Sequence, residues 1–240
     1  MSASHVTITA HNLARSFGSG EARTVAVQQA TVAFRSGEMS LLMGPSGSGK
    51  TTLLGMLSGL LRPDSGTVHI LGRDLWKMSE AERELFRLRH CGFVFQGANL
   101  MPALNARDHL EMVLRWGLRM PMDQVQRQAT EMLKSLGLSH KANLLPEHLS
   151  GGEKQLVAVG RALIKQPELL FADEPTSSLD WEHGRHVVEL LRDIAHEGAT
   201  VVMVTHDARL LPYADRIYRL EDGRVQGMSE ASAKAMLGVS

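Results

Sequence analysis

The chain has 240 residues, of which 43% are hydrophobic, enough to form one large core. Lys and Arg number 26 and are balanced by 26 Asp and Glu, which argues against a surface dedicated to nucleic acid or to an anionic membrane. The single cysteine, Cys91, excludes an internal disulfide framework. No stretch reaches the roughly 18 apolar residues of a membrane helix, and no signal peptide is recognisable. We therefore expect a cytoplasmic chain without a membrane span of its own.

The sequence predicts a small sheet followed by buried strands. Residues 5–38 carry spaced Val, Ile and Phe side chains that are typical of an antiparallel sheet. Ser40–Met43, Leu169–Ala172 and Val201–Val204 are continuous apolar runs, as in strands that are buried on both faces of a parallel sheet. Chemically active residues follow each run, and ligands collect at the carboxyl ends of such strands. We therefore expect a ligand site where the three runs end.

Helical patterns fill the gaps between these runs. Ser79–His90 opens with Ser79 and Glu82 at the spacing of a capping box. Asp123–Leu136 and His186–His196 place their apolar residues on one face and stop at a glycine. The pattern predicts a single α/β domain over residues 1–240, with a mostly parallel core and helices on both faces. Its expected parts are an antiparallel region at 5–38, a core at about 39–96 and 155–228, a helical subdomain at about 97–154, and a tail at 229–240.

The first apolar run ends in a loop, Gly44–Thr51, that fits the phosphate-loop pattern. Its glycines allow backbone N–H groups to turn toward phosphates without a Cβ clash. Lys50 supplies a positive charge to the β and γ phosphates, Thr51 is placed to bind Mg²⁺, and the next helix adds its N-terminal dipole. The candidate residues of this nucleotide site are Gly44, Pro45, Ser46, Gly47, Ser48, Gly49, Lys50, Thr51 and Thr52.

A second glycine motif, Leu149–Glu153, precedes another helical run. Ser150, Gly151 and Gly152 leave N–H groups and a hydroxyl at a helix start, which attracts phosphate. Because the upstream loop already holds the chain's own phosphate, the simplest interpretation is that this motif serves the nucleotide of a second subunit in a two-fold pair. A plain helix N-cap is the alternative for the motif taken alone.

Six motifs, in this order, resemble those of the ATP-binding subunits of ABC transporters, and the resemblance covers nearly the whole chain. They are Walker A at Gly44–Thr51, the Q-loop Gln96, the signature motif at Leu149–Glu153, Walker B at Leu169–Glu174, the D-loop at Ser177–Asp180 and the switch histidine His206. The resemblance implies the P-loop NTPase (RecA-like) fold, with ATP and Mg²⁺ as cofactors.

The resemblance also implies a role for each polar residue. Asp173 would hold Mg²⁺ together with Thr51 and Gln96. Glu174 would orient or deprotonate the attacking water, and His206 would contact the γ-phosphate. The contacts to the second subunit's nucleotide would come from Ser150, Gly151, Gly152, Glu153 and Asp180. Taken alone, a strand-end carboxylate or one histidine would indicate only structure.

Three further positions bear on this resemblance. Phe17 lies where the family usually places an aromatic ring that stacks on adenine, although simple packing is the alternative. Leu156 stands where the family commonly has arginine, and Gly160 replaces a more usual alanine. Both departures leave the phosphate contacts intact, but they leave open the packing of this helix and the charge of the subunit interface.

Within the family, Phe93–Leu104 and Ala172–Asp180 are similar to the macrolide-efflux and lipoprotein-releasing group, and most closely to DevA-type exporter ATPases. This implies an ATPase that works as an ATP-dependent dimer, most simply a homodimer, on the inner face of the cell membrane. It would power export or envelope-directed transport through a separate permease, often with a membrane-fusion adaptor. Gln96–Trp116 would receive a permease helix, although its apolar residues also suit a helical core.

The alternative function is a non-transport ABC ATPase that acts on DNA or another macromolecule. Such relatives carry long coiled coils or two ATPase domains in one chain. Here no sustained heptads occur, and each motif is present once. We therefore expect a transporter subunit, and no nucleic acid partner.

Overall fold

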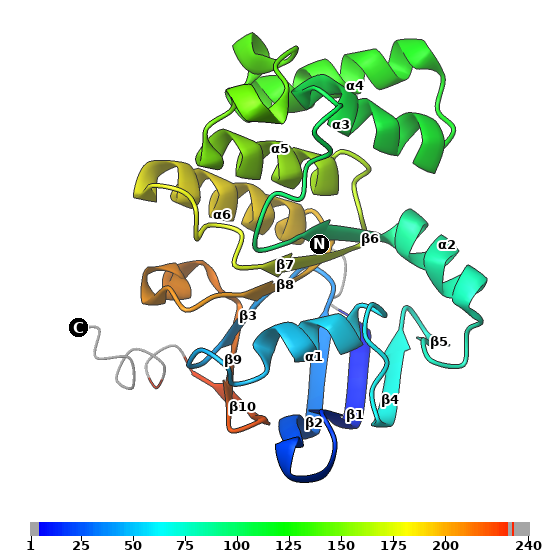
Figure 1. The fold of residues 1–240 in the computed structure, drawn as a ribbon, viewed down its shortest axis with the longest axis vertical. Coiled ribbons are helices and arrows are strands. Elements are labelled where there is room, and N and C mark those ends of the chain that lie inside the picture. Colours follow the sequence, from blue (N-terminus) through cyan, green and yellow to red (C-terminus); the bar gives the residue numbers. More distant parts are fainter. Residues whose placement is uncertain (1–4, 230–231, 233–240) are drawn as a thin grey trace.

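The structure, a computed structural model, describes residues 5–229 and 232 of the chain. It has two sheets with helices on and between them (Figure 1). The expected tail at 229–240 lies almost entirely outside the described residues.

The larger sheet has six strands in the order β10-β9-β3-β8-β7-β6. Its strands are β3 (Met39–Met43), β6 (Cys91–Val94), β7 (Leu169–Asp173), β8 (Thr200–Val204), β9 (Arg216–Glu221) and β10 (Arg224–Met228). All neighbours pair in parallel except β9 and β10, which form an antiparallel hairpin at the edge. Every residue of β3, β7 and β8 is buried, which confirms the three strands expected from the apolar runs.

Successive residues of these strands face opposite sides of the sheet, as the two-residue period of a strand requires. Leu41 and Met203 pack on one side, against the buried faces of α5 (Gly151–Leu163) and α6 (Trp181–His196). Leu42 and Val202 pack on the other side, against α1 (Lys50–Leu57) and the second sheet. The sheet therefore separates two hydrophobic cores.

The second sheet is antiparallel, with strand order β2-β1-β4-β5. Its strands are β1 (Val6–Phe17), β2 (Thr24–Arg35), β4 (Ser65–Ile70) and β5 (Arg73–Asp74), and a short 3-10 turn, η1 (Gly20–Ala22), joins the first two. The antiparallel pair expected at residues 5–38 is confirmed. The sheet continues beyond that range because β4 pairs with β1, which the exposed and polar start of β4 did not indicate.

A helical insert lies between β6 and α5, as expected. It contains α3 (Ala106–Met112), the π-helical turn η2 (Val113–Gly117), α4 (Met122–Ser135) and the 3-10 turns η3 (Ser139–Lys141) and η4 (Pro146–His148). Figure 1 shows α3 and α4 stacked beyond α5, on the far side of the large sheet from β1 and β2. The limits of this subdomain stay a prediction.

Helix starts follow their capping residues. α2 (Glu80–His90) begins after Ser79, which forms the expected capping box with Glu82. α6 begins at Trp181, five residues before the start that the apolar pattern suggested. The reason is Asp180, whose carboxylate accepts the His183 N–H at 3.0 Å and caps the helix earlier.

The two departures from the family pattern both lie in the packing of α5. Leu156 is buried in the core that the insert shares with the large sheet. A Cβ on Gly160 would stand 2.7 Å from Leu136 Cδ1, so the glycine allows α5 to approach α4 closely.

Cys91 in β6 is also buried, and burial raises the pKa of its thiol to about 12, which suits packing rather than chemistry.

One buried imidazole fixes the beginning of the insert. His109 in α3 is fully buried, and its Nε2 accepts the Met101 N–H at 2.8 Å. Its Nδ1 lies 2.9 Å from the Asn105 carbonyl oxygen, to which it donates in the neutral tautomer that both contacts require. Burial lowers the pKa of His109. The native protein therefore holds this ring neutral, because a second ring proton would break the contact to Met101.

We predict that His109→Ala lowers the free energy of unfolding by about 2–3 kcal/mol at pH 8, because a cavity forms and a buried N–H loses its acceptor. The difference should shrink as the pH falls below about 6.5, since the unfolded wild type then binds a proton that the native ring does not. Urea unfolding at pH 8 and pH 5.5 measures it. The exposed His140→Ala is the control, and a His109→Ala difference that does not change with pH would contradict this prediction.

Candidate functional site

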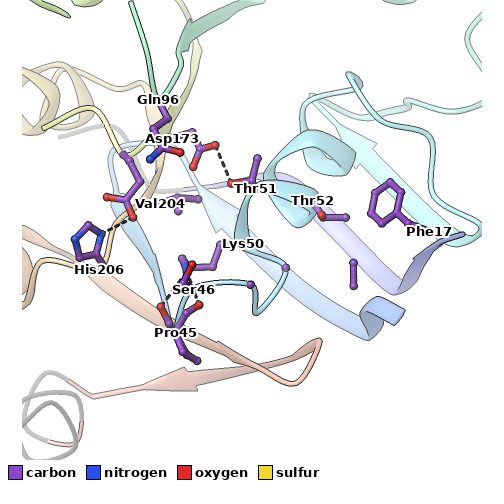
Figure 2. A pocket seen from close by; sticks show the side chains of 15 residues that line it. Phe17, Pro45, Ser46, Lys50, Thr51, Thr52, Gln96, Asp173, Val204 and His206 are labelled. Atoms are coloured by element: carbon purple, nitrogen blue, oxygen red, sulfur yellow. Dashed lines mark hydrogen bonds and ion pairs between the residues drawn. The ribbon is translucent and has the colours of Figure 1, made fainter. Parts of the chain in front are cut away.

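A cavity of about 640 Å³ opens at the carboxyl ends of β3, β7 and β8, where the two sheets meet (Figure 2). This is the place at which the sequence predicts a ligand site. The cavity is lined by Phe17, Ala26, Gly44, Pro45, Ser46, Gly47, Gly49, Lys50, Thr51, Thr52, Gln96, Asp173, Glu174, Val204 and His206.

The glycine loop at this cavity has no room for side chains at two positions. Gly44 has a φ of 150°, and a Cβ there would lie 2.0 Å from the Leu220 carbonyl oxygen of β9. Gly49 has a φ of 100°, and a Cβ there would lie 2.0 Å from the Ala26 carbonyl oxygen of β2. The loop therefore requires glycine at these positions because strands of both sheets press against its backbone.

Lys50 begins α1 and is buried. Its Nζ donates to the carbonyl oxygens of Gly44 at 2.9 Å and Pro45 at 2.8 Å, so the loop curls around its ammonium group. Burial lowers the pKa of Lys50, against the opposing effect of the nearby Glu174 and Asp173 carboxylates. The ammonium group thus lies where the loop faces the cavity.

The carboxylate of Asp173 suits a hard cation. The Thr51 hydroxyl donates to Asp173 Oδ2 at 2.8 Å, whereas Oδ1 is buried and has no hydrogen-bond partner within the described part of the chain. Figure 2 shows Gln96 beside this pair. No group of three His, Cys, Asp or Glu residues that could hold a metal occurs among residues 5–229 and 232. Mg²⁺ fits these oxygens, since it binds proteins through one or two carboxylates and completes its shell with phosphate and water.

Glu174 follows Asp173 in a strained backbone conformation. Its φ is +48°, a left-handed value that costs a non-glycine residue about 1–3 kcal/mol. Its N–H donates to the Val204 carbonyl at 3.0 Å, and its own carbonyl accepts the Ser177 hydroxyl at 3.0 Å. The buried carboxylate is 2.8 Å from Nδ1 of His206, whose side chain is 71% exposed. In this conformation Glu174 lines the cavity together with His206.

Two other predicted nucleotide-loop residues differ in their position. Thr52 lines the cavity, as expected. Ser48 does not, because it turns into the loop, where it is buried and its N–H donates to the Pro45 carbonyl at 3.3 Å. Phe17 lies at the end of β1 and lines the cavity, and the residue is 43% exposed. The Arg15 guanidinium lies 5.1 Å from the centroid of that ring.

The residues of the second glycine motif are not brought to this cavity. Ser150 forms a capping box at the start of α5, with its N–H 2.8 Å from Glu153 Oε2 and its hydroxyl accepting the Glu153 N–H at 3.2 Å. The Ser150 N–H lowers the pKa of Glu153, and Lys141 contributes to the shift. A Cβ on Gly151 would meet no atom within 4 Å. Ser150 and Gly151 are therefore exposed, Gly152 and Glu153 are half-buried, and Leu149 is buried.

Asp180, the last predicted nucleotide contact, also lies at the surface. Its carboxylate caps α6, and the His183 N–H lowers its pKa. It is absent from the cavity lining. Within one chain, the structure thus brings together every predicted residue of the cavity except Ser48, and it leaves the signature motif and Asp180 outside.

Three residues that the motifs do not indicate support the site. Ala26 and Val204 line the cavity from β2 and β8. Gln155 in α5 is buried and donates to the Phe95 carbonyl at 3.2 Å, next to Gln96. Its position on the apolar face of a predicted helix was the signal that could have revealed this contact.

The chain is similar to known ATP-binding proteins over most of its length. Residues 27–177 match the family model described as "ABC transporter". The chain is 38% identical over 216 residues to the ATP-binding protein HrtA of Staphylococcus haemolyticus, covering 90% of this chain and 97% of the relative. It is 40% identical over 219 residues to the macrolide export ATP-binding/permease protein MacB of Rhodopseudomonas palustris, covering 91% of this chain and 33% of that longer protein.

A solved structure is also similar. A dimeric ATP-binding cassette in a post-hydrolysis state, bound to ADP and phosphate, superposes with a TM-score of 0.88 at 35% identity. The similarity covers 93% of this chain and 98% of that one.

The glycine loop yields a matched pair of variants. Gly47 has a φ of +78°, but a Cβ there would meet no atom within 4 Å, whereas a Cβ on Gly49 would overlap a carbonyl oxygen. We predict that Gly49→Ala abolishes binding of a fluorescent ATP analogue. Gly47→Ala should lose much less affinity and lower the free energy of unfolding by only about 1–2 kcal/mol, because alanine is strained in the left-handed conformation. Equal losses of affinity in the two variants would contradict the steric explanation.

Proposed function

The chain belongs to the ABC transporter family and is an ATP-binding, ATP-hydrolysing subunit, and from this premise we propose that it powers export through a separate permease as one half of an ATP-closed pair. The observation that carries the proposal is the separation described above. One chain holds a phosphate loop with its acids and histidine in a single cavity, while Ser150 and Gly151 of its signature motif lie exposed elsewhere.

ATP occupies the cavity with its phosphates on the Gly44–Thr51 loop. Lys50 turns from the loop carbonyls toward the β and γ phosphates, and the half-exposed ring of Phe17 stacks on the adenine. Thr51, Gln96 and Asp173 would hold Mg²⁺, which the unpartnered buried oxygen of Asp173 supports. Bound there, the cation neutralises charge on the phosphates.

Hydrolysis uses the pair formed by Glu174 and His206. Glu174 orients or deprotonates the attacking water, and its buried side chain, carried on a strained backbone, already lines the cavity. His206 contacts the γ-phosphate while charge shifts to the leaving oxygen. The contact of 2.8 Å between the two side chains keeps the exposed imidazole at the mouth of the cavity until a phosphate is present.

The signature motif serves a second copy of the chain. Ser150, Gly151 and Gly152, helped by Glu153 and Asp180, complete the ATP site of that copy, and its motif completes this one. The exposure of Ser150 and Gly151, the open space at Gly151 and the dimeric solved relative support this arrangement. ATP then joins the two chains, and product release lets them part.

A groove between β6, α2 and the insert suits a permease helix. It has a volume of about 470 Å³ and is mostly apolar, with Phe95 38% and Trp116 65% exposed at its rim. It borders the Gln96–Trp116 stretch that the sequence predicts as the permease contact. Within residues 5–229 and 232, every helix is too short or too polar to span a bilayer. Attachment to the inner face of the membrane would therefore come through the permease, with an adaptor beyond it.

Export is the direction we propose, on the resemblance of Phe93–Leu104 and Ala172–Asp180 to the DevA-type and macrolide-efflux group. The similar MacB is named for macrolide export, whereas HrtA carries a provisional name that refers to hemin import. Transport of a labelled solute by everted vesicles that contain this chain and its permease distinguishes the two directions: export appears as ATP-driven uptake into these vesicles.

We predict that Glu174→Gln lowers ATP hydrolysis by about two orders of magnitude or more, because the water loses its base, and traps an ATP-dependent dimer. Size-exclusion chromatography with light scattering, with and without Mg²⁺ and ATP, detects the dimer. Glu197→Gln, at an exposed position, should behave as the wild type. A Glu174→Gln chain that stays monomeric even with its membrane partner would refute the paired site, and DNA-stimulated hydrolysis without a membrane partner would favour a DNA-associated ATPase.

A further inference from the structure

The segment that carries His206 is tied to the start of α6 by a cation–π contact. Arg209, in the 3-10 turn η5 (Ala208–Tyr213), places its guanidinium carbon 4.4 Å from the centroid of the Trp181 ring. Trp181 is the first residue of α6, directly after Asp180. The contact thus joins the loop before α6 to the turn that follows the histidine.

Arg209 is at the same time fixed to Asp207. Its Nε lies 2.9 Å and 3.1 Å from the two carboxylate oxygens, and its Nη2 lies 2.7 Å from Oδ2. The Arg209 N–H also donates to Asp207 Oδ1 at 3.0 Å. This forked pairing leaves the guanidinium plane little rotational freedom, and it presents that plane to the indole.

Asp207 is anchored on its other side. Its N–H donates to the hydroxyl of Thr205, which is fully buried, and the Thr205 N–H donates to the Leu42 carbonyl of β3 at 3.2 Å. His206 lies between these two fixed residues. Its own side chain is 71% exposed and contacts the Glu174 carboxylate through Nδ1 at 2.8 Å. The orientation of the imidazole therefore depends on the backbone on either side of it.

We propose that Trp181 is a positioning residue for His206 and acts through Arg209 and Asp207. The series Trp181–Arg209–Asp207 sets the backbone that carries the imidazole. This inference rests on the proposed roles of His206 at the γ-phosphate and of Asp180 at the subunit interface. Trp181 directly follows Asp180. If the second subunit displaces the loop that ends at Asp180, the displacement therefore reaches His206 through the side chains of Trp181, Arg209 and Asp207.

The test compares full-length variants by steady-state ATP hydrolysis and by equilibrium binding of a fluorescent ATP analogue. Trp181→Ala should lower kcat by at least about threefold and leave KM and nucleotide affinity unchanged, because the phosphate loop is untouched. Trp181→Phe keeps an aromatic face and should restore most of kcat. The control is Trp76, whose ring centroid lies 4.8 Å from the guanidinium carbon of Arg83 and which does not line the cavity. Trp76→Ala removes this second Trp–Arg pair and should leave kcat unchanged.

A double-mutant comparison tests whether Trp181 and Arg209 act in series. If Trp181 acts only through Arg209, then adding Trp181→Ala to Arg209→Ala should cause no further fall in kcat. A smaller fall than threefold, equal losses of kcat and nucleotide affinity, or independent effects in the double variant would overturn the proposal. Trp181→Ala in the Glu174→Gln background should still dimerise with ATP. Loss of that dimer in Glu174→Gln alone would instead refute the paired site.

Discussion

Two backbone carbonyls that press on the phosphate loop are the constraint on which the rest of the site depends. The Leu220 and Ala26 oxygens leave no room for a Cβ at Gly44 and Gly49, and they come from different sheets. The loop can therefore hold its shape only where β9 of the large sheet and β2 of the small sheet converge. This explains why the antiparallel sheet, which supplies few polar groups, is still needed: it forms the second wall of the cavity and carries Phe17 to its edge.

The site combines rigid support with groups that can be redirected. β3, β7 and β8 are wholly buried, so the residues at their ends have little freedom to shift. Lys50, by contrast, is held by carbonyl oxygens that a phosphate can replace, and the exposed His206 is held by its contact to Glu174. The strain in the Glu174 backbone is maintained by the strands around it. The cavity is thus preorganised for an anion. The contacts that a bound phosphate would replace are those of Lys50 with the loop carbonyls and of His206 with Glu174.

The sequence predicts the centre of the fold better than its edges. The three apolar runs correctly place β3, β7 and β8, because strands that are buried on both faces leave a continuous pattern. β4 and β9 carry mixed, partly exposed residues, and their place depends on pairing with distant strands, which no local pattern reveals. The early start of α6 at Trp181 likewise depends on one cap, Asp180, rather than on the apolar face of the helix.

In the cavity, too, the sequence reveals local motifs but not contacts between distant segments. Its glycines, acids and histidine are recognisable from motifs, but Ala26 and Val204 are ordinary apolar residues that matter only through their location. Ser48 fits the loop pattern and yet turns away from the cavity, because the tight turn at Pro45 buries it. The link from Trp181 through Arg209 to Asp207 joins segments whose contact only the folded chain creates.

The claim that each ATP site is shared between two copies of the chain is tested most directly by mixing two inactive variants. Lys50→Ala destroys a chain's own phosphate loop but keeps its signature motif, and Ser150→Arg does the reverse. In a mixed pair, the intact loop of one chain meets the intact motif of the other. A shared site predicts that the mixture hydrolyses ATP faster than the sum of the two variants measured alone. A mixture that stays as inactive as its components at every ratio would contradict the account.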